Sequence, residues 1–230
     1  GAALERDCTS LFARYEAEYP EPAAEYRRWM AGELPDGWDK TLPKFTAEQG
    51  ALATRQASGK TLDALAKVMP NLIGGSADLG GSTGVTLKDG GEFGPGTPGR
   101  ILHWGIREHG MGACLNGIAV HGGLRGFGST FFVFTDYMKP AIRLAALMKA
   151  PVIYICTHDS IGLGEDGPTH QPIGHLAMLR ALPGLSLFRP ADANETVEAW
   201  RAAIERNDAP TMLVLTRQKV PTFDRTKLRP

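Results

Sequence analysis

The feature that most constrains the fold is an alternation of short apolar runs with helical stripes through most of the chain. Six runs have the length and composition of strands: 72–77, 100–105, 124–132, 151–156, 185–190 and 211–216. Between them lie helical patterns; Leu62, Leu65 and Met69, for example, share one helical face. Strands that are apolar almost throughout, alternating with helices, predict a parallel sheet covered by helices on both faces.

Further helices are predicted over residues 107–121, 136–149 and 175–182, and after a capping box that begins at Asp192. The helix over 107–121 is rich in Gly and Ala, so it can pack very close to a neighbour. The first 46 residues differ, because they are rich in Glu, Arg, Ala and Tyr. They predict two short exposed helices broken around Pro20 and Pro22, followed by an extended linker. We therefore interpret 1–46 as an interdomain arm and 47–230 as the domain.

The overall composition excludes several classes of partner. Twenty-five basic residues balance 25 acidic ones, so nothing favours nucleic acid or an anionic membrane as a partner. There is no apolar run near the length of a membrane span, and the first residues do not resemble a signal peptide. Cys114 and Cys156 lie in apolar segments, so we expect buried reduced thiols and a reducing compartment.

Polar and aromatic side chains gather directly after the predicted strands. Because the carboxyl ends of parallel strands meet at one edge of a sheet, these side chains should share that edge. The set has the composition of an active site: Asp78, Ser82, Glu108, Phe131, Phe134, Tyr137, His158, Asp166, His170 and Arg217.

The loop over 157–172 carries the densest chemistry, and two simpler interpretations of it exist. Its G-x-G-x-x-G run is not read as a dinucleotide site, because two acidic residues lie inside it and no helix is predicted directly after it. A metal hydrolase built on His158, Asp166 and His170 is an alternative, although no H-E-x-x-H spacing exists. We predict no metal ligands in this chain.

Six ordered blocks carry a family resemblance: GGSADL, GIREHGMGA, TFFVFTDYMKPAIR, THDSIGLGEDGPTHQP, RPADANE and LTRQKVP. Together they resemble the middle, pyrimidine-binding domain of transketolase. The resemblance implies a thiamine-diphosphate-binding fold with a six-stranded parallel sheet. It also implies the transfer of a two-carbon ketol unit from a ketose phosphate to an aldose phosphate, as in the pentose phosphate pathway and the Calvin cycle. The Mg²⁺ ligands of the family belong to a diphosphate-binding domain whose Gly-Asp-Gly motif is absent here.

The resemblance also implies roles for the residues that bind the cofactor. Glu108 would hydrogen-bond a ring nitrogen of the pyrimidine and thereby activate the cofactor. Phe131, Phe134 and Tyr137 would hold the flat aminopyrimidine between their rings. Asp78 would lie near the cofactor at the subunit boundary.

Other residues would bind the phosphorylated sugar. His158 and His170 would contact its hydroxyl and carbonyl groups and move protons, as suits a side chain that titrates near neutral pH. Asp166 would accept a hydrogen bond from a hydroxyl. The phosphate would be gripped by Arg55, Ser82 and Arg217, although the sequence alone favours a surface role for Arg55. We interpret Phe132 as a core residue and His175 as a solvated helix histidine.

Several alternatives stay open on the sequence. In the family the site forms between the pyrimidine domain of one subunit and the diphosphate domain of another, so this chain would supply half a site and a homodimer is expected. The chain could instead be a non-catalytic docking or dimerisation module, or a homologue similar to dihydroxyacetone synthase. We expect a cytoplasmic location, with the chloroplast stroma as the alternative.

Overall fold

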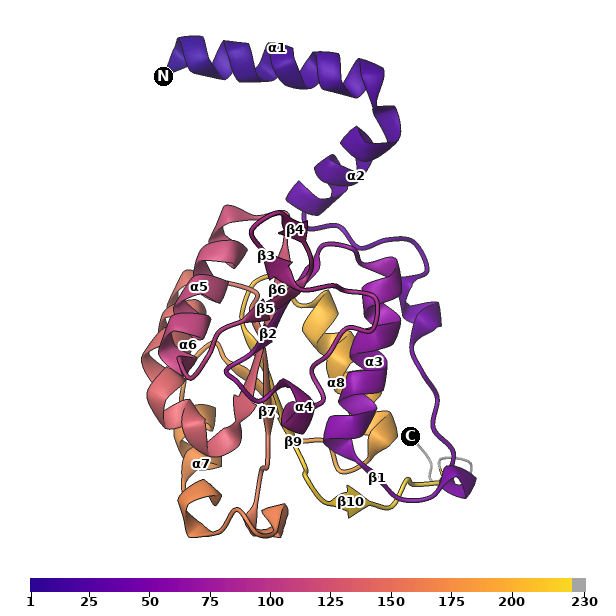
Figure 1. The fold of residues 1–230 in the computed structure, drawn as a ribbon, viewed down its shortest axis with the longest axis vertical. Coiled ribbons are helices and arrows are strands. Elements are labelled where there is room, and N and C mark those ends of the chain that lie inside the picture. The colour runs from indigo at the N-terminus through magenta and orange to yellow at the C-terminus, as the bar shows by residue number, and fades with distance from the viewer. Residues whose placement is uncertain (225–230) are drawn as a thin grey trace.

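A six-stranded parallel sheet lies at the centre of the computed structural model, which describes residues 1–224 (Figure 1). The strand order is β5-β2-β6-β7-β9-β8, and every neighbouring pair is parallel. The bounds are β2 (Leu72–Ser76), β5 (Ile101–His103), β6 (Arg125–Phe131), β7 (Ile153–Thr157), β8 (Ser186–Phe188) and β9 (Thr211–Leu215). The six predicted strands and the fold class are therefore confirmed.

Helices cover both faces of the sheet, as predicted (Figure 1). One layer holds α3 (Thr54–Val68) and α8 (Ala193–Glu205), and the other holds α5 (Glu108–His121), α6 (Thr135–Met148) and α7 (His175–Arg180). Successive side chains of β7 alternate between the layers, since Ile153 and Ile155 pack with the α3–α8 side while Tyr154 packs with the α5–α6 side. Two apolar cores result, one on each face.

Small residues bring these elements unusually close together. A Cβ on Gly74 in β2 would overlap the carbonyl oxygen of Phe127 in the neighbouring strand. A Cβ on Gly112 in α5 would lie 2.8 Å from the Cβ of Ala141 in α6. The glycine-rich helix thus packs closely on a neighbour, as its composition predicts.

The N-terminal arm consists of α1 (Ala2–Glu18) and α2 (Pro20–Met30), and Figure 1 shows α1 extending away from the body. The break between them falls at Tyr19, because both prolines lie in the first turn of α2, where a missing N–H costs nothing. Within the described residues, α1 buries no side chain. A bidentate ion pair between Arg27 in α2 and Glu16 in α1, with N–O distances of 2.8 and 2.9 Å, connects the two helices.

The segment after the arm is attached to the body. Trp38 and Leu42 are buried in the core on the α3–α8 side. The Asn194 side chain binds the backbone of Phe45 twice: its amide donates to the carbonyl at 2.9 Å, and its oxygen accepts from the N–H at 3.1 Å. This segment therefore has fixed contacts that its proline-rich sequence does not predict. The domain boundary at residue 46 stays a prediction.

The remaining elements are short. They are β1 (Leu52–Ala53) paired antiparallel with β10 (Lys219–Val220), β3 (Phe93–Gly94) with β4 (Thr97–Pro98), α4 (Gly80–Thr83), and the 3-10 turns η1 (Trp38–Thr41), η2 (Ala47–Gln49), η3 (Phe132–Phe134), η4 (Ile161–Leu163) and η5 (Pro168–His170). The G-x-G-x-x-G run at 162–167 overlaps η4 and is followed by η5 in place of a long helix. Asp192 caps α8 by accepting from the N–H of Glu195 at 2.8 Å, as predicted.

The structure corrects one expectation about the cysteines. Cys156 is buried as expected, but Cys114 is exposed. The reason is that α5 turns Met111, Gly112 and Leu115 inward, which leaves Cys114 on its outer side. Of the helices within residues 1–224, none has the length and apolar character needed to cross a membrane.

Candidate active site

The predicted functional residues follow the carboxyl ends of adjacent strands. Asp78 comes after β2, Glu108 after β5, Phe131 ends β6, His158 follows β7 and Arg217 follows β9. Since all these strands are parallel, their carboxyl ends lie at the same edge of the sheet. The candidate site is built on this edge.

At its centre is a cluster of aromatic and imidazole rings. The Phe131 ring stacks on His158, with centroids 3.7 Å apart, and on Phe134 at 5.9 Å and an interplanar angle of 10°. The His170 ring meets Phe134 edge-on at 5.4 Å. The Tyr137 ring lies next to Phe134, with centroids 6.1 Å apart, and Tyr137 is 65% exposed. The structure thus brings together five of the residues that the sequence selected.

A tight turn gives these aromatic residues their directions. β6 ends at Phe131 and passes directly into η3, where the Thr135 hydroxyl donates to the carbonyl of Phe132 at 2.7 Å. The Phe132 side chain enters the core and is 1% exposed. Its neighbours Phe131 and Phe134 face the ring cluster instead. The core role predicted for Phe132 is confirmed.

His158 is held in an unusual environment. It is 3% exposed, and its φ of 60° lies in the left-handed region that residues other than glycine rarely adopt. Its Nδ1 lies 2.8 Å from the Thr157 hydroxyl oxygen, and its Nε2 lies 3.8 Å from an Asp166 carboxylate oxygen. Burial, together with the nearby Arg55 guanidinium, lowers the pKa of His158 to about 4, so the ring is neutral at pH 7.

Two arginines lie beside this cluster. Thr54 and Thr216 exchange hydrogen bonds at 2.7 and 3.0 Å, which fixes the start of α3 against the end of β9. The next residue of each segment is an arginine, Arg55 and Arg217. Burial, followed by the neighbouring Arg217 charge, lowers the pKa of Arg55, while Asp166 opposes this shift. Arg55 is therefore part of the site and is half-buried.

Both arginines are also held by polar partners. Arg55 donates a hydrogen bond to the carbonyl oxygen of Ser82. Arg217 Nη2 lies 3.3 Å from a carboxylate oxygen of Glu165, whose side chain is 84% exposed. Ser82 itself is exposed. Guanidinium groups and a hydroxyl are thus presented to solvent next to the histidines, an arrangement suited to a phosphate dianion.

The Glu108 side chain is buried at the first residue of α5. It is 7% exposed, and within residues 1–224 no hydrogen bond or ion pair is found for its carboxylate, whose oxygens are not among the fully buried unpaired atoms. A buried carboxylate normally has a partner, so this group is suited to a ligand that brings a donor. Asp78 is exposed at the same edge, with a left-handed φ of 61°.

The metal-hydrolase alternative is not supported. Among the described residues, no three His, Cys, Asp or Glu side chains are grouped so that they could hold a metal ion. The reason is geometric: His158 stacks on Phe131, and His170 meets the rings of Phe131 and Phe134 edge-on. Asp166 is the one carboxylate that the described residues place near His158, and His170 Nδ1 lies 2.8 Å from the Thr169 hydroxyl oxygen.

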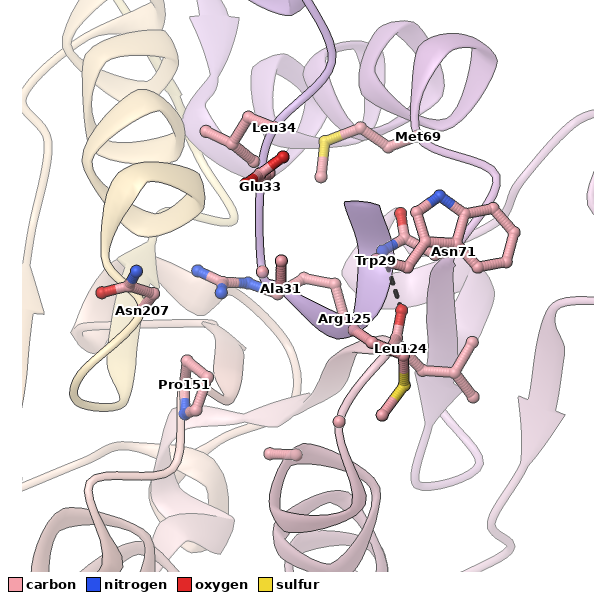
Figure 2. Close-up of a pocket in the computed structure, with 15 residues that line it drawn as sticks. Trp29, Ala31, Glu33, Leu34, Met69, Asn71, Leu124, Arg125, Pro151 and Asn207 are labelled. Atoms are coloured by element: carbon pink, nitrogen blue, oxygen red, sulfur yellow. Dashed lines mark hydrogen bonds between the residues drawn. The ribbon is translucent and has the colours of Figure 1, made fainter. Parts of the chain in front are cut away.

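A hollow at the opposite edge of the sheet is separate from this site (Figure 2). It measures about 200 Å³ and is lined by residues near the amino ends of strands, among them Asn71, Arg125, Pro151 and Asn207. Burial lowers the pKa of Arg125 to about 10. Its guanidinium donates to the carbonyls of Ala203 and Ile204 at 2.7 and 3.0 Å, and so it caps α8. The hollow lies at the junction with the arm.

His175 was expected to be solvated, and that expectation is wrong. The side chain is 8% exposed, and its Nε2 lies 3.2 Å from the carbonyl oxygen of Val133 and 3.1 Å from a carboxylate oxygen of Asp136. It packs on Phe132 at 5.6 Å. α7 is short and lies against the turn that carries the ring cluster. This contact buries His175, although the local periodicity predicts an exposed side chain.

Residues 50–222 match the family described as the transketolase pyrimidine-binding domain. The chain belongs to the transketolase pyrimidine-binding domain family. It is 57% identical over 227 residues to the transketolase of Geobacillus stearothermophilus, which covers 98% of this chain and 34% of that protein. It is 54% identical to a chloroplastic transketolase of Craterostigma plantagineum, over 99% of this chain and 44% of that protein.

Solved structures agree with the assignment to this family. A transketolase of Pichia stipitis in complex with sedoheptulose 7-phosphate superimposes with a TM-score of 0.93 at 45% identity, covering 96% of this chain and 34% of that one. A split-gene transketolase described as an inactive β4 tetramer matches with a TM-score of 0.62 at 32% identity, over 79% of this chain and 57% of that one. This transketolase pyrimidine-binding domain spans about a third of the length of the first curated relatives it matches.

Proposed function

We propose that this chain supplies the pyrimidine-binding half of a transketolase active site. The observation that carries the proposal is a buried, unpartnered Glu108 carboxylate at the same sheet edge as the ring cluster and Arg55 and Arg217. The reaction would transfer a two-carbon ketol unit from a ketose phosphate to an aldose phosphate. The names of the relatives and the sugar-phosphate complex of the Pichia protein support this choice.

The residues present fit thiamine diphosphate. Glu108 offers an acceptor for a protonated ring nitrogen of the pyrimidine, and burial strengthens such a bond by excluding water. Phe131, Phe134 and Tyr137, whose rings lie together, would hold the flat ring, and Asp78 would lie near the cofactor. When bound, the cofactor supplies a nucleophilic carbon for attack on the ketose carbonyl. Mg²⁺ would be held by a diphosphate-binding domain, as the family resemblance implies.

The remaining residues would bind and orient the sugar phosphate. His158 is neutral at pH 7, so one ring nitrogen can accept a proton or hydrogen bond from a sugar hydroxyl while the other donates. His170, which meets the Phe131 ring edge-on at a centroid distance of 6.0 Å, would serve the same purpose. Asp166 would accept from a hydroxyl, and the phosphate would lie against Arg55, Ser82 and Arg217.

The outer face of α5 and α6 is a suitable surface for the missing half of the site. Val120, Leu144 and Leu147 on these two helices are 65%, 46% and 63% exposed, and Cys114 is exposed as well. Figure 1 shows α5 and α6 side by side on one side of the sheet, and exposed apolar side chains on such a helical layer are suited to a protein interface. We propose that a diphosphate-binding domain docks here and that the assembled enzyme is a homodimer. Bacterial and chloroplastic relatives both match, so the cytoplasm, with the chloroplast stroma as the alternative, remains the proposed location.

A complementation assay tests this function. The chain is assayed for ketol transfer from xylulose 5-phosphate to ribose 5-phosphate with thiamine diphosphate and Mg²⁺, alone and mixed with a transketolase diphosphate-binding domain. We expect activity only in the mixture. Glu108→Gln should lower it by roughly 10²–10⁴-fold, the scale of a general acid–base group, whereas Glu205→Gln, an exposed change on α8, should leave it unchanged. Near-normal turnover of Glu108→Gln would refute the assigned role.

A non-catalytic docking module is the second candidate. It is favoured by the match to the split-gene protein described as an inactive β4 tetramer. Size-exclusion chromatography of the same mixture separates the two candidates. A stable complex without turnover would identify a docking module, and turnover would exclude that reading.

A further inference from the structure

Asp159 is buried next to His158, yet the proposed reaction gives it no role. Its side chain is 1% exposed, and one carboxylate oxygen accepts a hydrogen bond from Arg189 Nε at 2.7 Å. The other oxygen is buried and has no hydrogen-bond partner among the described residues. The stability of this anion therefore depends on one arginine, and breaking such a pair leaves a buried charge uncompensated.

The ion pair crosses the sheet edge. Arg189 follows β8 and Asp159 follows β7, while β9 lies between those two strands. The contact therefore ties together two loops that share no backbone ladder. It fixes the residue immediately after His158, two positions beyond the end of β7.

His158 needs such an anchor because of its backbone. A left-handed φ of 60° is unfavourable for histidine, and it persists only where the surroundings impose it. The β7 ladder holds the residue before it, since Thr157 pairs with Phe131 and Leu215. On the other side, the nearest side-chain anchor is the Asp159–Arg189 pair. With both in place, the imidazole stays stacked on Phe131 at 3.7 Å.

We propose that Asp159, through its ion pair with Arg189, is a positioning residue that holds His158 in its stacked, buried place in the substrate site. The proposal rests on the proposed function for its significance to catalysis. Its structural content, an anchor for His158, can be measured without any reaction. Asp159 itself acts through its neighbour and is not assigned a contact with substrate.

The test is NMR of His158 in the full chain, with Asp159→Asn as the variant. Stacking on Phe131 should give the wild-type ring protons a large ring-current shift and an NOE to the phenylalanine ring. In Asp159→Asn we expect both signals to weaken as the ring leaves the cluster. We also expect the proton affinity of the ring to rise by about tenfold as it regains water.

The sign of the proton-affinity change separates positioning from simple electrostatics. Removing a nearby anion without moving the ring would lower the proton affinity, whereas release of the ring into solvent raises it. The other charged or titratable groups that act on His158 are Arg55, Asp166, Arg217 and His170, and all are retained in the variant. A lowered affinity with intact stacking would overturn the proposal.

Further variants guard against unfolding and against general effects. Arg189→Met removes the same ion pair from the other side and should reproduce the shift. Arg189→Lys keeps the charge and should give a smaller one, which preserves the test if Asp159→Asn does not fold. Arg201→Met is the matched control, because it removes the ion pairs of Arg201 on α8 to Asp39 in η1 and to Glu198, and it should leave the His158 signals unchanged.

These measurements use the chain without cofactor or partner. A failed ketol-transfer assay would therefore refute the proposed function and leave the anchor standing. Unchanged His158 signals in both Asp159→Asn and Arg189→Met would refute the anchor, whatever the assay shows.

Discussion

Replacing His158 with glutamine should remove a large part of the acid sensitivity of this fold. Glutamine keeps a polar planar end group and does not titrate. In the wild type the ring is buried beside Arg55, and both conditions disfavour its protonated form. The folded protein therefore resists binding a proton that the unfolded chain accepts readily.

The magnitude follows from the pKa difference between the two states. The pKa falls from 6.5 in the free side chain to about 4 in the fold. One pKa unit corresponds to about 1.4 kcal/mol, so the full effect is about 3 kcal/mol. Because the folded pKa is the lower one, the unfolded state binds more protons between pH 6.5 and 4. Wild-type stability should accordingly fall as the pH drops through that window.

The assay is urea unfolding, followed by tryptophan fluorescence, from pH 7 to pH 4. The useful quantity is the difference in unfolding free energy between wild type and His158→Gln at each pH. Loss of stacking on Phe131 shifts this difference by a constant, while the titration changes it by about 3 kcal/mol across the window. His121→Gln, at an exposed position on α5, controls for the loss of a histidine. A difference that stays constant down to pH 4 would refute the reasoning.

Two further predictions concern the scaffold. Gly74→Ala places a methyl group on the Phe127 carbonyl between adjacent strands, so it should destabilise the domain by about 3 kcal/mol or more and lower its urea midpoint; an unchanged midpoint would show that β2 can shift away from β6. Asn194→Ala removes both hydrogen bonds to the Phe45 backbone and should cost about 1–3 kcal/mol, with faster amide exchange confined to the segment around Phe45; uniform acceleration through the sheet would contradict a local role.

The sequence was informative wherever a signal is local. Apolar runs mark the strands, and the prolines that begin α2 mark the break in the arm, because both depend on residues close together in the chain. A parallel sheet also places everything that follows a strand at one edge. That rule alone places the residues after β2, β5, β6, β7 and β9 together.

Exposure was predicted less well, because periodicity shows which residues share a helical face but not what covers that face. Cys114 lies in an apolar helix and is nevertheless exposed, since α5 buries its other side. His175 lies on a short helix and is buried, since α7 packs against the turn after β6. Trp38 lies in a proline-rich linker and is part of the core. Each outcome depends on a neighbour that is distant in sequence.

The sequence by itself determined the strands, the edge that carries the chemistry and the residue types available there. The tertiary structure alone decided which of those residues act on each other. Arg55 lies beside Arg217 because Thr54 and Thr216 bond across 162 positions, and Asp159 reaches Arg189 across β9, which lies between β7 and β8. Strand order and long-range pairing come from the packing of the whole chain, so no local pattern contains them.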